Sequence, residues 1–234
     1  MLSWQEMISL QRLKRRKLNG YFLVKLRGLI LLPVEITQAV RYLSKKYPMA
    51  TVLLYGSYAV NLHTANSDID LIVFTNISKA IHETTEFNLH LLDAWVYDKD
   101  SINIIDNYLH IYPFITLRDD FSIARKLEQR IVEHRRLIAV KPTDYEKTQL
   151  MLWLNKMLQR AREDDIIGQY RYNTLLNDLP ELYCRFKGLY YDGPIKTIRI
   201  MQGNDPSLFD IYSQLLLTPK NCQLLSSLYA KLST

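Results

Sequence analysis

The order of apolar and polar residues along the first half of the chain predicts alternating helices and strands. Pro33 stands before apolar residues at helical spacing, which predicts a helix that begins there. Two runs of strand-forming residues, 51–55 and 72–74, follow this helix, and the apolar run 87–96 predicts a buried strand. Between the last two runs, at 78–84, we expect a short helical or loop connection.

Helical spacing dominates after residue 100. We expect helices over 102–112 and 121–137, separated by a short strand at 114–117. Thr143 is followed three residues later by Glu146, and this capping-box pattern predicts the start of a further long helix.

Proline and glycine mark the element boundaries in the last third of the chain. A helical stretch over 169–187 meets Pro180, where we expect a kink or a restart, and Gly188 is expected to end it. Asp205 and Thr218 each precede a proline, and this pairing of a capping side chain with proline predicts a helix start at both positions.

Together these elements predict an α/β (α+β) fold, in which a small mixed sheet with flanking helices precedes a helical bundle. We expect three segments: a basic helical arm at 1–32, a sheet domain at 33–140 and a helical domain at 141–234. Within the last segment, residues 192–194 are expected to form a turn.

The net charge of +6 is concentrated near the N-terminus. Residues 1–32 hold seven Lys and Arg residues and one acid, whereas the rest of the chain is nearly balanced. Such a basic arm can bind a nucleic acid, an acidic partner or an anionic membrane. It can equally be the solvated face of a helix whose apolar side, with Trp4, Ile8 and Leu13, packs on the body, and we favour this interpretation.

The composition is that of an ordinary globular protein, with 48% apolar and 23% charged residues. The longest apolar run, 29–34, is too short to cross a bilayer, and no secretory leader pattern stands at the N-terminus. Cys184 and Cys222 have no metal or redox spacing, so we expect free thiols and a cytoplasmic location. The glycine-rich loops of kinases and P-loop proteins are absent, as is any zinc-binding spacing of histidines.

The candidate chemistry gathers between residues 51 and 74. A strand-forming run ends at Gly56 and Ser57, and Asp68 and Asp70 then lead into the next run. Two carboxylates at this spacing on a strand lie on the same face. Like charges so close repel, and one would take up a proton unless a divalent metal ion keeps both ionised. The pair therefore predicts a metal site, with a plain surface Asp pair as the alternative.

This block resembles the signature of the nucleotidyltransferase superfamily, whose core is similar to that of DNA polymerase β. The signature consists of Gly-Ser, here at 56–57, a short helix, and Ser-Asp-x-Asp-Leu, here at 67–71. Asn61 stands where glycine is common, and because Asn also tolerates a left-handed backbone we expect the turn to be kept. The predicted layout resembles the two-domain antibiotic-modifying nucleotidyltransferases, such as the kanamycin and streptomycin enzymes, in architecture alone over 141–234.

The resemblance implies roles for individual residues. Gly56 would let the backbone approach a phosphate, and Ser57 at the helix N-terminus would help to hold the β- and γ-phosphates of an NTP, with ATP as the expected nucleotide. Asp68 and Asp70 would be catalytic and would bind Mg²⁺. Ser67 would belong to the nucleotide-binding part of the motif.

A site for two Mg²⁺ ions needs a third carboxylate on a neighbouring strand, and Asp93 is the best candidate. It is the only charged residue in the apolar run 89–96, and the family's third carboxylate stands at about this distance downstream. A strand-end Asp in a salt bridge is the alternative interpretation. Glu83 and Glu86 are second choices, because they precede the apolar run and look exposed.

These assignments imply a metal-dependent enzyme that moves an NMP from an NTP to a hydroxyl of a small-molecule acceptor, such as an antibiotic, by in-line displacement. Two alternatives stay open. The acceptor is an RNA end or a protein, as in toxin–antitoxin nucleotidyltransferases, or the chain is a non-catalytic nucleotide-binding module. The basic arm supports a macromolecular acceptor, whereas the intact Asp68 and Asp70 argue against a non-catalytic module. We expect no membrane partner.

Overall fold

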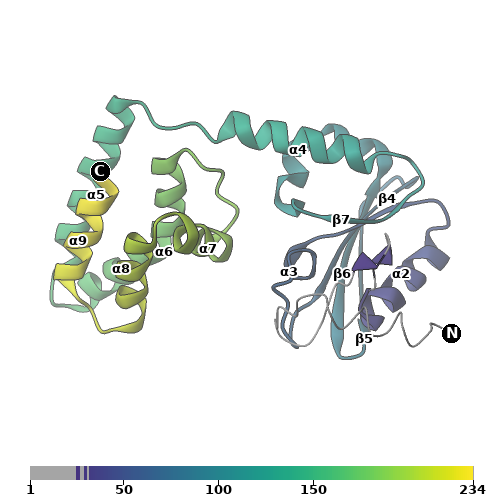
Figure 1. Ribbon diagram of the computed structural model, residues 1–234, viewed down its shortest axis with the longest axis horizontal. Helices are drawn as coiled ribbons and strands as arrows, with labels where there is room; N and C mark the ends of the chain where they lie inside the picture. Colours follow the sequence, from purple (N-terminus) through teal and green to yellow (C-terminus); the bar gives the residue numbers. More distant parts are fainter. Residues whose placement is uncertain (1–24, 27–28, 31, 234) are drawn as a thin grey trace. The chain divides into compact units, whose positions relative to one another are not determined.

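The computed structural model describes residues 25–26, 29–30 and 32–233. The chain divides into two compact units (Figure 1). The sheet unit comprises the described parts of Met1–Ile104 and Ile111–Glu128, and the helical unit comprises those of Ile105–His110 and Gln129–Thr234. The expected basic arm at 1–32 lies almost entirely outside the described residues. The expected division into a sheet domain at 33–140 and a helical domain at 141–234 stays a prediction.

A five-stranded mixed sheet forms the centre of the sheet unit. In spatial order its strands are β5 (Ile81–Phe87), β6 (His90–Asp98), β4 (Ile69–Thr75), β3 (Thr51–Leu54) and β7 (Ile115–Asp119). Strands β4 and β6 run parallel, and the other neighbouring pairs are antiparallel. Two very short strands, β1 (Lys25–Leu26) and β2 (Leu29–Ile30), form a separate antiparallel pair. The mixed sheet with its helices confirms the predicted fold class.

Helix α2 (Val34–Lys46) covers one face of the sheet (Figure 1), and Pro33 stands immediately before it, as predicted. Its buried side chains pack against alternate apolar residues of the central strands. This core consists mainly of Ile36, Ala39, Leu43, Val52, Leu54, Ile69, Leu71, Val73, Leu92, Ala94 and Val96. Because side chains alternate along a strand, the intervening residues, Asp70 and Asp93 among them, lie on the opposite face.

Strand β5 shows that the expected connection at 78–84 was wrong. It pairs with β6 in an antiparallel hairpin whose two turn residues, Asn88 and Leu89, both have positive φ angles. Leucine rarely adopts this conformation, so the sequence carried no recognisable turn signal. The strand expected over 87–96 therefore crosses the hairpin turn, and most of it belongs to β6.

The chain between β6 and the second half differs partly from expectation. Two 3-10 helices, Lys99–Asn103 and Ile105–Ile111, replace the single helix expected over 102–112. Strand β7 and helix α4 (Ala124–Ile138) lie close to their predicted positions, and Leu127 and Ile131 of α4 are fully buried.

The helical unit is built from α5 (Asp144–Ala161), α6 (Ile166–Lys187), α7 (Pro194–Asn204), α8 (Pro206–Leu217) and α9 (Cys222–Ser233) around one apolar core. Thr143 and Glu146 form the predicted capping box at the start of α5. Gly188 adopts a left-handed φ of 63° and ends α6, as predicted.

Two helix starts in this unit correct the sequence expectation. Pro194 opens helix α7, where only a turn was expected. Helix α9 begins at Cys222, because Asn221 Oδ1 accepts a hydrogen bond from the backbone N–H of Leu224 at 3.0 Å and so caps it. Thr218, the expected cap, instead donates its hydroxyl to a carbonyl at the end of α8.

Helix α6 runs through Pro180 without a restart, because another residue satisfies the carbonyl that proline leaves unpaired. Pro180 has no N–H, so the carbonyl of Leu176, four residues earlier, lacks its usual helical donor. The hydroxyl of Tyr212 on α8 donates to this carbonyl at 3.1 Å, and the tyrosine is buried. One hydrogen bond between helices thus replaces one within the helix.

We predict that Tyr212→Phe lowers the free energy of unfolding by roughly 1–2 kcal/mol, because it leaves the Leu176 carbonyl unsatisfied in the core. In a Pro180→Ala background, the restored backbone N–H should satisfy the same carbonyl, so Tyr212→Phe should cost less. Urea denaturation of the four proteins in this cycle measures both effects. Equal losses in the two backgrounds would show that the tyrosine does not compensate for the proline.

Candidate active site

The predicted signature forms a strand, a one-turn helix and a second strand: β3, α3 (Gly56–Ala59) and β4. Gly56 has a φ of +66°, and a Cβ added to it would lie 2.0 Å from Oδ2 of Asp70. Glycine is required here both by backbone conformation and by space. The start of α3 therefore lies directly against the Asp70 carboxylate. Asn61 has a φ of 56°, which confirms the expected left-handed turn after this helix.

Asp70 occupies an electrostatically unfavourable position. The pKa of this carboxyl is raised to about 6, first by burial and then by the negative charges of Asp93 and Asp68. A hydrogen bond from the backbone N–H of Ser57 acts in the opposite direction but is outweighed. With this raised pKa, the Asp70 carboxyl loses its proton only close to neutral pH. A bound cation would favour the ionised form and lower the pKa again.

The parallel pairing of β4 with β6 places Asp93 directly beside Asp70 in register. Both side chains lie on the face that does not pack against α2. Asp68 is exposed and stands one residue before β4. The structure therefore places Asp70 and Asp93 side by side on one face of the sheet, with Asp68 just before β4, and the charges of Asp93 and Asp68 both raise the pKa of Asp70.

The chemistry of this donor set fits a divalent cation. Carboxylate oxygens are the ligands that Mg²⁺ prefers, and a bound cation would offset the repulsion between the carboxylates. Among the residues whose side chains are described, 32–232, no three Asp, Glu, His or Cys side chains converge closely enough to hold a metal ion. The assignment of Asp68, Asp70 and Asp93 as metal ligands stays a prediction.

The two serines of the motif differ in their surroundings. Ser57 lies in the first turn of α3, and its backbone N–H points to Asp70. Ser67 Oγ accepts a hydrogen bond from the backbone N–H of Thr64 at 2.8 Å, which closes the loop before β4. Nucleotide binding by Gly56, Ser57 and Ser67 stays a prediction.

A buried polar network, not anticipated from the sequence, holds the signature loop. His90 Nδ1 lies 3.1 Å from the Ser67 carbonyl oxygen and 3.2 Å from the Tyr58 hydroxyl. Since a carbonyl only accepts, Nδ1 carries the proton and donates. Tyr58 in turn donates to Glu35 Oε1 at 3.2 Å, and the ring of His63 stacks on Tyr58 at 4.2 Å.

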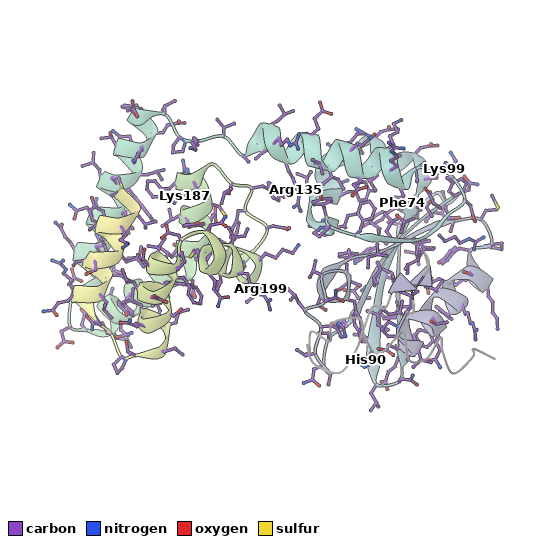
Figure 2. All side chains as sticks on the ribbon, in the orientation of Figure 1. Phe74, His90, Lys99, Arg135, Lys187 and Arg199 are labelled. Carbon is purple, nitrogen blue, oxygen red and sulfur yellow. The ribbon has the colours of Figure 1, made fainter. Side chains whose placement is uncertain are left out.

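This network joins four parts of the sheet unit: α2 through Glu35, α3 through Tyr58, the loop through Ser67 and the start of β6 through His90, which Figure 2 labels. Glu35 and Tyr58 are buried, so their polar groups depend on these bonds. Because Ser67 immediately precedes Asp68, the network fixes the backbone that carries the first carboxylate. In the sequence, His90 stood inside the strand expected over 87–96 and gave no sign of this network.

Tyr55, the last residue before Gly56, also lies at this site. Burial raises the pKa of its phenol, and the charges of Asp70 and Asp93 raise it further. The phenol of Tyr55 therefore keeps its proton at neutral pH and loses it only in strong base. Its position between β3 and α3 did not distinguish it from a core aromatic residue in the sequence.

Glu83 is not exposed, contrary to the sequence expectation. It lies on the face of β5 that packs towards α2 and is only 5% exposed. Its carboxylate accepts hydrogen bonds from Tyr47 Oη at 2.6 Å and from Lys46 Nζ at 2.9 Å. Glu83 therefore ties α2 to β5, whereas Glu86 is exposed as expected.

Two further expectations concern the whole chain. Cys184 is buried and Cys222 half-buried, and both are free thiols, as predicted. In the part of the chain that the structure describes, no helix combines the length and the apolar character that crossing a membrane requires.

The family model of the nucleotidyltransferase domain matches residues 36–157, which is more than half of the chain. The chain belongs to this family. The matched segment contains the whole signature, from Gly56 to Leu71, and also Asp93. Membership in the nucleotidyltransferase domain family implies an NTP substrate and usually a divalent metal ion.

Solved structures of similar chains exist. One of them, a nucleotidyltransferase-like protein from Exiguobacterium sibiricum 255-15, is 16% identical, with a TM-score of 0.37, over 85% of this chain and 74% of that one. A comparison with curated protein sequences gives no match.

We predict that Gly56→Ala destabilises this nucleotidyltransferase by roughly 1–3 kcal/mol through its left-handed backbone, and further through the clash with Asp70. Asp70→Ala provides the control background, because it keeps the backbone cost of Gly56→Ala and removes the nearest atoms of the clash. Chemical denaturation should show a smaller loss when Gly56→Ala is added to Asp70→Ala than when it is added to wild type. Equal losses in the two backgrounds would contradict the close approach to Asp70.

We predict that the Asp70 carboxyl lowers the stability of the metal-free protein as the pH rises from about 4 to 7, because the folded protein keeps a proton on Asp70 up to about pH 6 whereas the unfolded chain releases it near 3.8. Above that range Asp70→Asn should be more stable than wild type by about 1–2 kcal/mol, after allowance for solvent screening of a half-buried group. Near pH 4 the difference should vanish. Urea denaturation in EDTA across this range measures it, and parallel profiles for the two proteins would contradict the raised pKa.

Proposed function

We propose that the protein transfers an NMP from an NTP to a hydroxyl group of a small molecule. The observation that carries this proposal is the register of β4 and β6, which sets Asp70 beside Asp93. Gly56 supports it as well, because it holds the start of α3 against the same carboxylate. Family membership supplies the reaction class, and the acceptor is inferred.

Each residue has a role in the proposed reaction. The acceptor oxygen bonds to the α-phosphorus, the bond from that phosphorus to the oxygen bridging the α- and β-phosphates breaks, and pyrophosphate and the hydroxyl proton are released to solvent. Asp68, Asp70 and Asp93 would hold two Mg²⁺ ions, and Gly56, Ser57 and Ser67 would bind the nucleotide. When bound, the ions would supply positive charge that favours ionisation of the acceptor hydroxyl and offsets the charge of pyrophosphate. The bonds from His90 and Tyr58 keep the backbone before Asp68 in place.

The distribution of charge favours a small acceptor over a nucleic acid for the body of the protein. Outside residues 1–32 the acidic and basic residues nearly balance, so the described part of the chain has little net attraction for a polyanion. The basic arm is the one feature that favours a macromolecular acceptor, an RNA end or a protein. A macromolecular acceptor should therefore need the basic arm for binding, whereas a small acceptor should not.

The test is a labelling experiment with the full-length protein, Mg²⁺ and α-³²P-labelled ATP, GTP, CTP and UTP, offered aminoglycosides, tRNA and a cell lysate. Label should appear in a small molecule. A full-length variant with Lys14, Arg15, Arg16 and Lys17 changed to Gln should label it equally well. Label in RNA or protein that this variant no longer produces would establish the macromolecular alternative, and no label in any fraction would favour a non-catalytic module.

We predict that Asp68→Asn and Asp70→Asn each reduce transfer by at least ~10²-fold while the fold survives, because each removes a ligand that stabilises charge in the transition state. Asp164→Asn is the matched control, since Asp164 is an exposed acid in the helical unit. Initial rates with labelled NTP, alongside circular dichroism, separate lost chemistry from lost folding. Wild-type turnover by either well-folded site variant would reject the assignment.

A further inference from the structure

His82 makes a contact at the candidate site that neither the sequence nor the family match assigned. Its Nε2 lies 2.7 Å from Oδ1 of Asp93. Its ring stacks on Trp95, with 4.3 Å between ring centroids and 8° between planes. Because an ionised carboxylate only accepts, Nε2 is the donor in this bond.

Pairing of β5 with β6 explains how one histidine reaches both residues. In this antiparallel pair His82 stands opposite Trp95, and Thr84 stands opposite Asp93. Contact with Asp93 is therefore a diagonal contact across the pair, which a side chain as long as His can make. The same face of the sheet carries all of these side chains, because they alternate with the buried residues of β6.

The stack fixes the direction in which His82 donates. Trp95 lies between His82 and Tyr97 in the stack, with the Tyr97 ring 6.1 Å away and inclined by 15°. A ring held flat against an indole loses freedom to turn about its own bonds, so its N–H stays aimed at Asp93. This hydrogen bond engages Oδ1 of Asp93. It thereby restricts rotation of the carboxylate group and the position of its second oxygen.

We propose that His82 is a positioning residue for the third carboxylate: it orients Asp93 so that its second oxygen serves the same cation as Asp70. This inference rests on the proposed function, because it takes Asp93 as a metal ligand. Carboxylates that bind metals are commonly held by such hydrogen bonds, and removing the partner typically weakens metal binding 10–100-fold. His82 acts as a hydrogen-bond donor here and exchanges no proton.

Two substitutions separate the bond from the stack. His82→Phe keeps a flat ring on Trp95 but removes the N–H, whereas His82→Gln keeps an N–H at a similar reach but removes the ring. His134→Phe is the matched control, because His134 Nε2 makes the equivalent contact with Asp106 Oδ1, at 2.8 Å, within the helical unit.

The measurement is Mn²⁺ binding to the full-length protein, from the loss of the free-ion signal in electron paramagnetic resonance. We expect His82→Phe to bind Mn²⁺ about 10–100-fold more weakly than wild type. His82→Gln and His134→Phe should bind it much as wild type does, with unchanged melting temperatures for all three variants. In the transfer assay, excess Mn²⁺ should restore turnover to His82→Phe, which a loss of structure would not allow.

Several outcomes would overturn the inference. Wild-type affinity in His82→Phe would show that the bond does not orient Asp93, and equal weakening in His82→Gln would assign the effect to the ring. A wild-type protein that binds no Mn²⁺ would reject the metal site itself. Mn²⁺ binding that depends on His82, in a protein that labels no acceptor, would retain this inference and reject the proposed function.

Discussion

The parallel pairing of β4 with β6 is the constraint on which the candidate site depends. It sets Asp70 against Asp93, two like charges on adjacent strands, where burial and repulsion raise the pKa of Asp70 to about 6. This arrangement costs stability in the absence of a cation. It persists because the opposite face of the same strands is a closed apolar core beneath α2, which holds the pairing whatever the state of the carboxylates. Apolar packing on the face covered by α2 thus holds Asp70 and Asp93 together on the other face, despite their repulsion.

Hydrogen bonds from neighbouring side chains then fix the geometry around these charges. On one side, the chain of donors from His90 through Tyr58 to Glu35 holds the loop before Asp68. On the other, His82 holds Asp93 from the neighbouring strand. Gly56 completes the site by allowing α3 to approach Asp70 closely. Such preorganised surroundings are what a site needs if it is to stabilise charge in a transition state without rearranging.

The helical unit shows the same dependence of local structure on distant partners. Helix α6 continues through Pro180 because Tyr212 of α8 satisfies the carbonyl that the proline leaves free. The cap at Asn221, rather than the pattern at Thr218, decides where α9 begins. In both cases one hydrogen bond, which the local sequence pattern did not predict, changed where a helix begins or continues.

The sequence by itself determined the strand–helix–strand signature, the pairing of Asp68 with Asp70 and the capping box at Thr143, because each depends on residues within a few positions of one another. It also placed Asp93 on a strand, since a lone charge in an apolar run is conspicuous. Only the tertiary structure decided which strands pair. The hairpin turn at Asn88 and Leu89 made residues 81–87 a strand, and this strand brought His82 to Asp93 and buried Glu83. These contacts join elements through backbone pairing and side-chain packing across the fold, and such long-range partners leave no period or spacing in the chain that could have revealed them.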